Sequence, residues 1–389
     1  MIRARITGTG SYAPERVMTN SDLEQLVATS DEWIRERTGI RERRIAAQGQ
    51  ACSDLALIAA ERALKAAGLS GSDLDLILLA TCTGDMPLPS TACLLQHRLG
   101  ATRAAACDIA AACCGFVYAL GVADAYVRTG MRHVLVVGSE VMSTITDWTD
   151  RNTCILFGDG AGAAVVSAAE GDRGILSTHL HSDGSLSDLI VVPGGGTRIP
   201  PSEAMVGERS QYIKMKGNET FKVAVRTLEE VARETLAAHQ LSVDDLDLYI
   251  PHQANLRIIT AAARSLKVEE SLFFVNLDRY GNTSAASIPI ALVEAIQQGR
   301  IKENDHIAFV GFGGGLTWAS MIVKWGAPKP EDRTRMLNRQ RREAIYAFAF
   351  WRSRLIRLSR QFNDLVNRIR PKQGRLQRLR RRIDNEDLE

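Results

Sequence analysis

The sequence predicts an α/β protein made of two similar halves, residues 1–172 and 173–327, followed by an extension over residues 328–389. Short apolar runs such as LILLA, VLVVG and IAFVG alternate with segments of about 10 to 15 residues that have helical spacing. In addition, LSGSDLDL at 69–76 recurs as LSVDDLDL at 241–248. The alternation predicts mostly parallel sheets covered by helices, and the repeat predicts that this arrangement occurs twice.

The repeat continues through further segments in the same order. GMRHVLVVG at 130–138 corresponds to GRIKENDHIAFVG at 299–311, and both predict a helix end, a turn and a buried strand. Each is then followed by a glycine-rich strand, FGDGAGAAVV at 157–166 and FGGGLTWASMIV at 312–323. Several elements in one order favour a duplicated fold over a chance likeness of one segment.

Composition and charge narrow the class of protein. The opening residues lack the apolar run of a signal peptide, and no later stretch approaches about 20 apolar residues, so a cytoplasmic protein is expected. The seven cysteines lie within the first 154 residues without the spacing of a zinc site or a disulfide framework. Most of them are therefore expected to be small core residues, with one reactive thiol among them.

The candidate nucleophile is Cys113. AAACDIAAA leads into it, and CCGFVYALGVADAYV then places apolar side chains on one helix face. Cys113 is therefore expected where a strand turns into a helix, and the free N–H groups at such a helix start would lower the pKa of its thiol. The alternative is a core cysteine, but the position favours a nucleophile for acyl transfer. Cys114 is expected to point into the packing.

Two further residues are expected beside it. LFFVN at 272–276 is interpreted as the strand that precedes the second helix start, and the register that follows from this strand maps Cys113 onto Asn282. His252 ends the strand LDLYIPHQAN, and ligands of α/β proteins bind at the ends of strands. A helix cap for Asn282 and a structural role for His252 are the alternatives.

The glycine runs at 192–196 and 312–315 do not match nucleotide-binding loops. Neither has the Lys and Ser/Thr of a P-loop or a GxGxxG pattern, which argues against nucleotide hydrolysis and dinucleotide binding. A glycine-rich strand start can instead offer backbone N–H groups to a developing oxyanion, as acyl transfer from a thioester requires.

Four separated motifs carry a family resemblance: AAACCGF around Cys113, PHQANLR around His252, YGNTSAAS around Asn282 and FGGGLTWAS near residue 312. Together they make residues 1–327 resemble 3-oxoacyl-[acyl-carrier-protein] synthase III, a condensing enzyme with the thiolase-like fold. The resemblance implies an internally duplicated, five-layered αβαβα fold and a homodimer. It also implies a Cys-His-Asn site at the bottom of a pantetheine tunnel, with no metal or redox cofactor.

The resemblance further implies an acyltransferase of fatty-acid biosynthesis. Cys113 would take an acyl group from acyl-CoA, and malonyl-acyl carrier protein would then enter and lose CO2. His252 and Asn282 would hydrogen-bond the malonyl thioester oxygen, while the backbone N–H groups of Cys113 and Gly314 would hold the oxyanion of the acyl thioester. The product would be 3-oxoacyl-acyl carrier protein.

The same resemblance assigns binding residues by motif position. Those expected to bind CoA are Trp33 and Arg151 on the adenine, Arg37 on the phosphates and Asn255 on the pantetheine arm. Those expected at the acyl pocket are Leu88, which would reach across the dimer, and Phe312. Those expected to dock the acidic carrier protein are Lys222 and Arg257.

Departures and absences refine the expectation. No Cys follows residue 154, unlike in thiolases, and Asn282 stands where elongating synthases have a second histidine. Leu88 replaces the more common Phe, which leads to the hypothesis of a primer longer or more branched than acetyl. An acyltransferase of specialised metabolism that uses a non-malonyl acceptor is the alternative function. A non-catalytic subunit would be expected to have lost one of the three site residues.

The extension over 328–389 lies outside the resemblance. It carries 18 basic and 8 acidic side chains, against 30 and 37 in residues 1–327. Apolar residues from Phe348 to Ile369 follow helical spacing, which predicts a basic amphipathic helix. Such a helix could bind an anionic membrane surface, a partner helix or the carrier protein, or it could pack on its own body or on the dimer mate. Nucleic-acid binding is not expected, because no recognised module accompanies the charge.

Overall fold

The computed structural model describes residues 2–326 together with positions 351, 352, 355 and 359. The chain divides into two compact units, Met1–Arg335 and Met336–Glu389. In the second unit the four described positions are helical, and the remainder of the predicted extension lies outside the described residues. The following description concerns the first unit.

Two sheets form the centre of the first unit. The five-stranded sheet has the order β1-β7-β6-β4-β5, and its strands are β1 (Ile2–Tyr12), β4 (Leu76–Ala80), β5 (Ala105–Ile109), β6 (His133–Val141) and β7 (Asp159–Glu170). The four-stranded sheet has the order β11-β12-β13-β8, and its strands are β8 (Gly174–Ser182), β11 (Leu248–Pro251), β12 (His306–Gly313) and β13 (Thr317–Lys324). Read from β8, the second sheet repeats the order of β1, β7, β6 and β4. The proposed boundary at residue 172 stays a prediction, although β7 and β8 lie on either side of it.

The strands are less parallel than predicted. In the first sheet β4 pairs in parallel with β5 and β6, but β7 is antiparallel to both β1 and β6. In the second sheet only β11 and β12 are parallel. The expectation of mostly parallel sheets is wrong, because the glycine-rich strands β7 and β13 return beside the preceding strand without a crossover helix between them.

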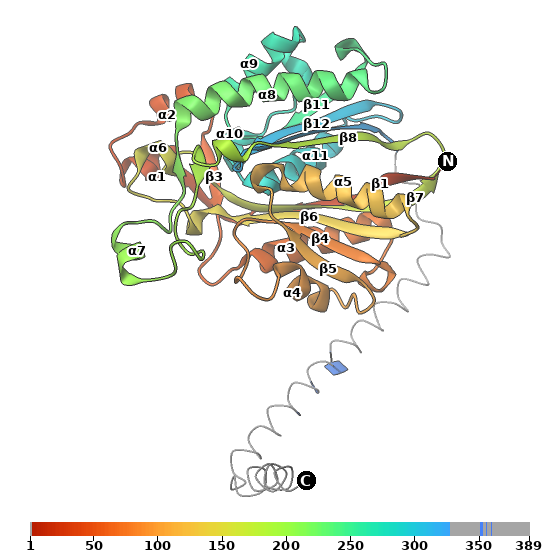
Figure 1. Ribbon diagram of the computed structural model, residues 1–389, viewed down its shortest axis with the longest axis horizontal. Helices are drawn as coiled ribbons and strands as arrows, with labels where there is room; N and C mark the ends of the chain where they lie inside the picture. The colour runs from red at the N-terminus through yellow and green to blue at the C-terminus, as the bar shows by residue number, and fades with distance from the viewer. Residues whose placement is uncertain (1, 327–350, 353–354, 356–358, 360–389) are drawn as a thin grey trace, which may run out of the picture. The chain divides into compact units, whose positions relative to one another are not determined.

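Five layers stack through the unit, as Figure 1 shows. Helices α3 (Cys52–Ala67) and α4 (Thr91–Arg98) cover the outer face of the first sheet. Helices α5 (Gly115–Arg128) and α11 (Ser287–Gln297) lie between the two sheets, and α8 (Gly217–Ala237) and α9 (Leu256–Leu266) cover the second. The expected αβαβα arrangement of the thiolase-like fold is confirmed.

The sequence explains which helices take the middle layer. A helix between two sheets must be apolar on both sides, and α11 buries Ile288, Ile290, Leu292 and their neighbours. The outer helix α8 has a single buried stripe instead, at Ala224, Leu228, Val231 and equivalent positions.

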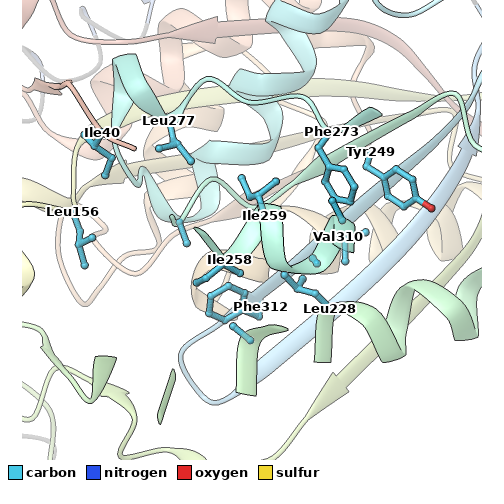
Figure 2. Packing of buried hydrophobic residues seen from close by; sticks show 14 of the residues in the cluster. Ile40, Leu156, Leu228, Tyr249, Ile258, Ile259, Phe273, Leu277, Val310 and Phe312 are labelled. Atoms are coloured by element: carbon cyan, nitrogen blue, oxygen red, sulfur yellow. The ribbon is translucent and has the colours of Figure 1, made fainter. Parts of the chain in front are cut away.

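One large hydrophobic cluster packs the second sheet against its outer helices and continues to first-half residues such as Ile40 and Leu156 (Figure 2). Within it the rings of Tyr249 and Phe273 stack with centroids 4.7 Å apart. Phe273 makes only an isolated parallel bridge to Tyr249, after a short 3-10 turn at Glu270–Leu272. The predicted strand at 272–276 is therefore absent. The stacked ring, this single bridge and hydrogen bonds between the Gln253 side chain and the backbone of Phe274 and Asn276 hold the segment instead.

Shorter elements connect these layers. They are β2 (Arg16–Thr19), β3 (Glu42–Ile45), β9 (Ile190–Val191), β10 (Lys214–Met215), α1 (Asn20–Glu24), α2 (Asp31–Thr38), α6 (Arg151–Cys154), α7 (Glu203–Gly207) and α10 (Leu277–Tyr280). Over the described part of the chain, no helix is both long and apolar enough to cross a bilayer.

Strand β5 is an edge of the first sheet and is poorly covered. Cys107 on this strand and Cys93 on the neighbouring helix α4 are both exposed. Only three of the seven cysteines are buried, so the expectation that most belong to the core is wrong. The reason is that the others lie on the uncovered edge or border the cavity described below.

Candidate active site

Cys113 lies in a tight turn between β5 and α5. A 3-10 turn at Ala112–Cys114 follows the strand, and α5 begins at Gly115. Ala112 has a φ of 43°, a left-handed conformation that is strained for a residue other than glycine. The neighbouring Cys114 is fully buried, and its thiol lies 3.4 Å from the carbonyl of Thr317. The predicted strand-to-helix position of Cys113 is present, with one extra 3-10 turn.

The second half contains a matching turn. Ser284–Ala286 forms a 3-10 turn whose first residue has a φ of 49°, and α11 begins directly afterwards at Ser287. The two turns contact each other. When they are aligned, Cys113 corresponds to Ala285, the middle residue of the second turn. The predicted register, which paired Cys113 with Asn282, is wrong because it rested on a strand that the second half does not form.

Cys113, His252 and Asn282 nevertheless line one cavity of about 740 Å³. Phe312 and Gly314 line it as well. The cavity lies where the ends of β5 and β11 meet the starts of the two central helices. The sequence thus placed the three residues in one site, although the register argument for Asn282 fails.

The backbone holds Asn282 from both sides. Its N–H donates to the carbonyl of Leu156, and its own carbonyl accepts from the N–H of Gly158. The side-chain oxygen Oδ1 accepts a hydrogen bond of 2.9 Å from the N–H of Ser284. Because Oδ1 is occupied in this way, the Nδ2 group is the one that can donate to a bound molecule.

His252 follows β11 directly and is held by its backbone and its ring. Its N–H donates to the carbonyl of Val310, and its Nδ1 lies 2.7 Å from the hydroxyl of Ser287. The ring meets Phe312 edge-on, with centroids 5.6 Å apart. Burial lowers the pKa of His252 to about 3, so the ring is neutral at physiological pH. With Nδ1 engaged, Nε2 is the nitrogen left for a ligand.

The thiol of Cys113 does not have the lowered pKa expected at a helix start. Burial raises its pKa to about 12, and the charge of Glu140 adds to the rise, whereas a hydrogen bond with Ser284 opposes it. The thiol is only partly exposed, so the loss of solvation outweighs the effect expected from the helix start. The prediction of a depressed pKa is wrong.

Gly313 packs against the backbone of the nucleophile turn. A Cβ at this position would lie 2.7 Å from the backbone nitrogen of Cys113 and 3.2 Å from its Cβ. Only glycine therefore fits where β12 ends beside Cys113. Gly314, which follows, lines the cavity, so the glycine run lies on the nucleophile as expected for an oxyanion-binding segment.

Trp33 and Arg151 lie together outside the cavity lining. The guanidinium group of Arg151 is 3.8 Å from the centre of the Trp33 ring, and that of Arg37 is 5.5 Å away. Arg151 lies so close to the ring that no base fits between them. The two residues predicted to enclose adenine are thus in direct contact in this structure.

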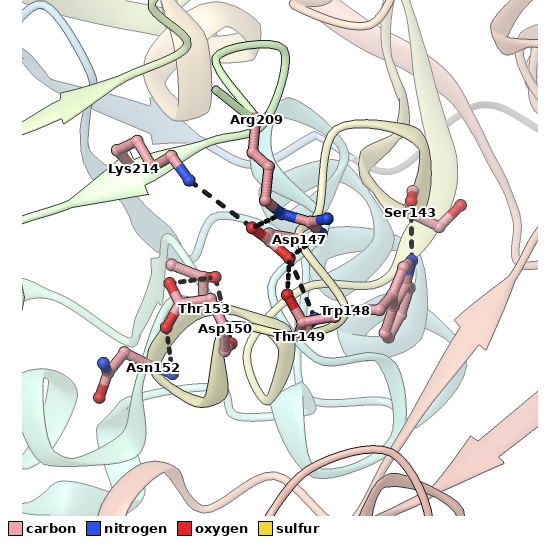
Figure 3. Close-up of polar contacts among 9 residues, drawn as sticks. All are labelled: Ser143, Asp147, Trp148, Thr149, Asp150, Asn152, Thr153, Arg209 and Lys214. Carbon is pink, nitrogen blue, oxygen red and sulfur yellow. Dashed lines mark hydrogen bonds and ion pairs between the residues drawn. The ribbon is translucent and has the colours of Figure 1, made fainter. Parts of the chain in front are cut away.

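Polar contacts fix the loop that carries Arg151 (Figure 3). Asp150 caps the short helix α6 by accepting from the N–H of Asn152. Asp147 accepts a hydrogen bond of 2.9 Å from Arg209 Nε and lies 3.6 Å from Lys214. These ion pairs attach the α6 loop to Arg209, which follows α7, and to Lys214 in β10.

Arg37, Asn255, Lys222 and Arg257 also line the cavity. Asn255 caps α9 by accepting from the N–H of Arg257, and its Nδ2 donates to the carbonyl of Arg37 at 3.1 Å. Arg257 and Lys222 are both exposed. Leu88, by contrast, is 85% exposed and does not line the cavity.

Several polar residues of the site were not predicted. They are Ser287 beside His252, Ser284 and Glu140 beside Cys113, and Cys82, which also lines the cavity. Both serines stand in the motif YGNTSAAS, so the motif itself was their only signal. Among the described residues, no group of three or more His, Cys, Asp or Glu side chains is arranged to hold a metal ion.

Comparisons with known proteins agree with this fold. Residues 107–184 match the family described as 3-oxoacyl-[acyl-carrier-protein (ACP)] synthase III, and residues 236–325 match its C-terminal part. The beta-ketoacyl-[acyl-carrier-protein] synthase III of Alkalilimnicola ehrlichii is 56% identical over 84% of this chain and 100% of its own. The chain belongs to the 3-oxoacyl-[acyl-carrier-protein] synthase III family.

Other members of this synthase III family show the same likeness. The beta-ketoacyl-[acyl-carrier-protein] synthase III of Roseiflexus castenholzii is 54% identical over 83% of this chain and 98% of its own. The crystal structure of 3-oxoacyl-[acyl-carrier-protein] synthase III from Aquifex aeolicus matches with a TM-score of 0.77 at 49% identity, over 83% of this chain and 100% of that one. The chain is therefore a synthase III-type condensing enzyme, an acyltransferase that starts fatty-acid synthesis.

Proposed function

We propose that this enzyme joins an acyl group from acyl-CoA to malonyl-acyl carrier protein, with loss of CO2, through Cys113, His252 and Asn282. The observation that carries the proposal is the cavity that is lined together by a thiol and by two side chains able to donate hydrogen bonds. The first step transfers the acyl group to Cys113 as a thioester and releases CoA. The backbone N–H groups of Cys113 and Gly314 hold the oxyanion that forms during this step.

In the second step the malonyl thioester oxygen lies between His252 and Asn282. Asn282 offers its Nδ2 group, because Oδ1 is already bonded to Ser284. The Ser287 hydroxyl lies 2.7 Å from Nδ1 of His252. In the proposed tautomer this hydroxyl donates to Nδ1, so the ring proton resides on Nε2 and points to the substrate. Two neutral donors then stabilise the enolate left after loss of CO2, and its carbanion attacks the acyl thioester on Cys113.

CoA and the carrier protein approach the same cavity from its exposed side. Arg37 meets the CoA phosphates and Asn255 the pantetheine arm, while Trp33 and Arg151 separate to take the adenine between them. Lys222 and Arg257 attract the acidic carrier protein, and their position at the cavity supports this role. No metal or redox cofactor takes part in the proposed chemistry.

The proposed assembly is a homodimer that works in the cytoplasm, where acyl-CoA and carrier protein are available. The exposed edge strand β5 supports the dimer, because an uncovered edge is a surface for pairing with a second copy. Leu88, which is 85% exposed in the single chain, would then close the acyl pocket of the partner. Its size, smaller than Phe, favours a primer longer or more branched than acetyl.

The experiment that tests the function uses radiolabelled acyl-CoAs, malonyl-acyl carrier protein and the full-length enzyme, with Cys113→Ser as the control. Label on the wild-type protein alone, followed by a labelled 3-oxoacyl product, is the expected result. Label without a carbon-carbon product supports the alternative, transfer to a non-malonyl acceptor. The primer hypothesis fails if acetyl-CoA loads far faster than any four- to eight-carbon or branched acyl-CoA.

The extension over 328–389 remains a separate proposal. Its basic amphipathic sequence supports binding to an anionic membrane surface or to a protein partner. Flotation with anionic liposomes compares the full chain with a version that ends at Lys329. Equal partitioning of the two rejects the membrane.

A further inference from the structure

Transfer of the acyl group to Cys113 requires that the thiol lose its proton, and no nearby group is an obvious base. Burial raises the pKa of the Cys113 thiol to about 12, so the thiol is protonated when acyl-CoA arrives. His252 does not serve as the base, because burial lowers its pKa to about 3 and its Nδ1 is engaged with Ser287. Another group must accept the thiol proton.

Glu140, near the end of β6, is a fully buried carboxylate close to this thiol. Its Oε2 accepts from the N–H of Cys82 at 3.1 Å and from the hydroxyls of Thr81 and Thr83 at 3.1 and 2.5 Å. Its Oε1 accepts from the hydroxyl of Ser284 at 2.9 Å. Among the described residues, no Lys, Arg or His forms an ion pair with it. A buried carboxylate without a cation is costly to retain, which makes it a candidate for a functional role.

Ser284 connects this carboxylate to the nucleophile. Its hydroxyl donates to Glu140 at 2.9 Å, and Ser284 lines the same cavity as Cys113 from a turn that contacts the nucleophile turn. A hydroxyl has one proton, so it can donate to only one of the two partners at a time. While Ser284 donates to the carboxylate, its oxygen can accept from the thiol of Cys113, and the three groups would then form one directed chain of hydrogen bonds.

We propose that Ser284 relays the thiol proton of Cys113 to Glu140 when the acyl group is loaded. This inference rests on the proposed role of Cys113 as the nucleophile. The S–H bond of Cys113 breaks as its proton moves to Ser284, and the hydroxyl proton of Ser284 moves to Glu140. The thiolate then attacks the acyl-CoA carbonyl carbon. When the tetrahedral intermediate collapses, the leaving CoA thiolate takes up the proton from Glu140 through Ser284, so CoA leaves as a thiol and both residues are restored.

The charges around the relay favour a transfer over two separate ionisations. The other titratable groups that face Glu140 are the thiols of Cys52, Cys82 and Cys113, and its charge raises the pKa of each. A carboxylate at the buried Glu140 and a thiolate at Cys113 would therefore repel each other. Moving a proton along the relay keeps a single negative charge, which shifts from Glu140 to Cys113.

A purely structural role for Glu140 is the competing explanation, because its hydrogen bonds also hold the loop from Thr81 to Thr83. The test therefore separates loading from decarboxylation in the full-length enzyme. Glu140→Gln removes the acceptor, and Ser284→Ala breaks the relay but keeps the backbone N–H that holds Asn282. Asp159→Asn is the matched control, since Asp159 is an equally buried carboxylate on β7 whose partners are Ser143 and Ala46.

Two rates are measured at several pH values between about 6 and 9. The first is single-turnover acylation of Cys113 by labelled acyl-CoA, and the second is decarboxylation of malonyl-acyl carrier protein by enzyme acylated beforehand. We expect Glu140→Gln and Ser284→Ala to slow acylation roughly 10²- to 10⁴-fold, the usual range for loss of a positioned proton acceptor. The acylation rate of the variants should rise about tenfold per pH unit, because the thiolate of Cys113 must then form by direct loss of its proton to solvent. Decarboxylation should stay near the wild-type rate, and the double variant should be no slower than either single one.

Three results would overturn the relay. One is acylation by Glu140→Gln or Ser284→Ala at the wild-type rate and with the wild-type pH profile. Another is an equal loss of acylation and decarboxylation in Glu140→Gln. The third is a loss in Asp159→Asn as large as that in Glu140→Gln. If wild-type enzyme carries no label on Cys113, the proposed function itself fails, which is a different outcome from normal labelling in all variants.

Discussion

The hydroxyl of Ser287 lies 2.7 Å from Nδ1 of His252, and the same oxygen also accepts a hydrogen bond from the N–H of Gln253. Ser287 is the first residue of α11, so the start of a central helix fixes the orientation of the histidine ring. Whether Nε2 of His252 can donate a hydrogen bond therefore depends on Ser287, a residue that does not touch the substrate.

Ser287→Ala should slow decarboxylation of malonyl-acyl carrier protein roughly 10-fold or more, because Nδ1 loses its partner and the ring no longer keeps its proton on Nε2. Acylation of Cys113 should be unchanged, because Ser287 does not contribute to loading. The two half-reactions, measured separately, check this, and Ser287→Thr is the control that keeps a hydroxyl. Equal slowing of both half-reactions contradicts the prediction.

The decarboxylation rate should show no ionisation of His252 between about pH 5 and 8. The pKa of the ring is about 3 in the folded protein, below its usual 6.5, so the ring stays neutral throughout this range. A bell-shaped profile with a limb near pH 6.5 that disappears in His252→Gln would contradict this expectation.

The same pKa predicts how stability changes in acid. The unfolded chain takes up the His252 proton more readily, so this contribution to the free energy of unfolding is fully present above about pH 6.5 and is lost as the pH falls toward 3. Urea unfolding at several pH values should therefore show a shallower loss in His252→Gln than in the wild type. Identical slopes for the two proteins would reject the prediction.

Gly313→Ala should reduce acylation of Cys113 roughly 10²-fold, the usual effect of moving a reacting group by about 1 Å. The new Cβ would lie 2.7 Å from the Cys113 nitrogen, so the nucleophile turn must shift. Gly196→Ala is the control, because nothing lies within 4 Å of a Cβ at that position. Normal labelling of Gly313→Ala would show that the turn tolerates the methyl group.

Trp33→Ala should raise the KM for acyl-CoA about tenfold or more, since stacking on a base is worth roughly 1–3 kcal/mol. The kcat should change little, because Trp33 does not line the cavity that holds Cys113. Steady-state kinetics with acyl-CoA and with the matching acyl-pantetheine, which lacks adenine, separates the two effects. If the KM values for both substrates rise equally, Trp33 does not act by stacking on the adenine.

Much of the fold could be predicted from local sequence patterns. The repeat LSGSDLDL and LSVDDLDL marks β4 and β11, and the register of this repeat also aligns the turns at Ala112–Cys114 and Ser284–Ala286. Strand direction could not be predicted, because buried parallel and antiparallel strands have the same apolar runs. The segment 272–276 was predicted as a strand for a similar reason. Its apolar sequence is typical of a buried strand, but in the structure the segment only stacks the ring of Phe273 on Tyr249.

Only the site residues that stand in recognisable sequence motifs could be predicted. Cys113, His252 and Asn282 each stand in a recognisable motif, and all three line the cavity. The pKa of Cys113 could not be predicted, because it depends on enclosure by distant segments rather than on the helix start alone. Glu140 could not be predicted either, since it lies far along the chain from Ser284, the serine that binds it.

The matching turns at Ala112–Cys114 and Ser284–Ala286 have a consequence for how this catalyst can change. Both halves place a matching 3-10 turn beside the cavity, although only the first half has a strand such as β5 before it, so at the turns themselves the two sides differ in their side chains. New chemistry at this site then requires exchanges at a few positions rather than a new scaffold. A duplicated copy of this enzyme that kept both turns could acquire new substrates and still fold in the same way.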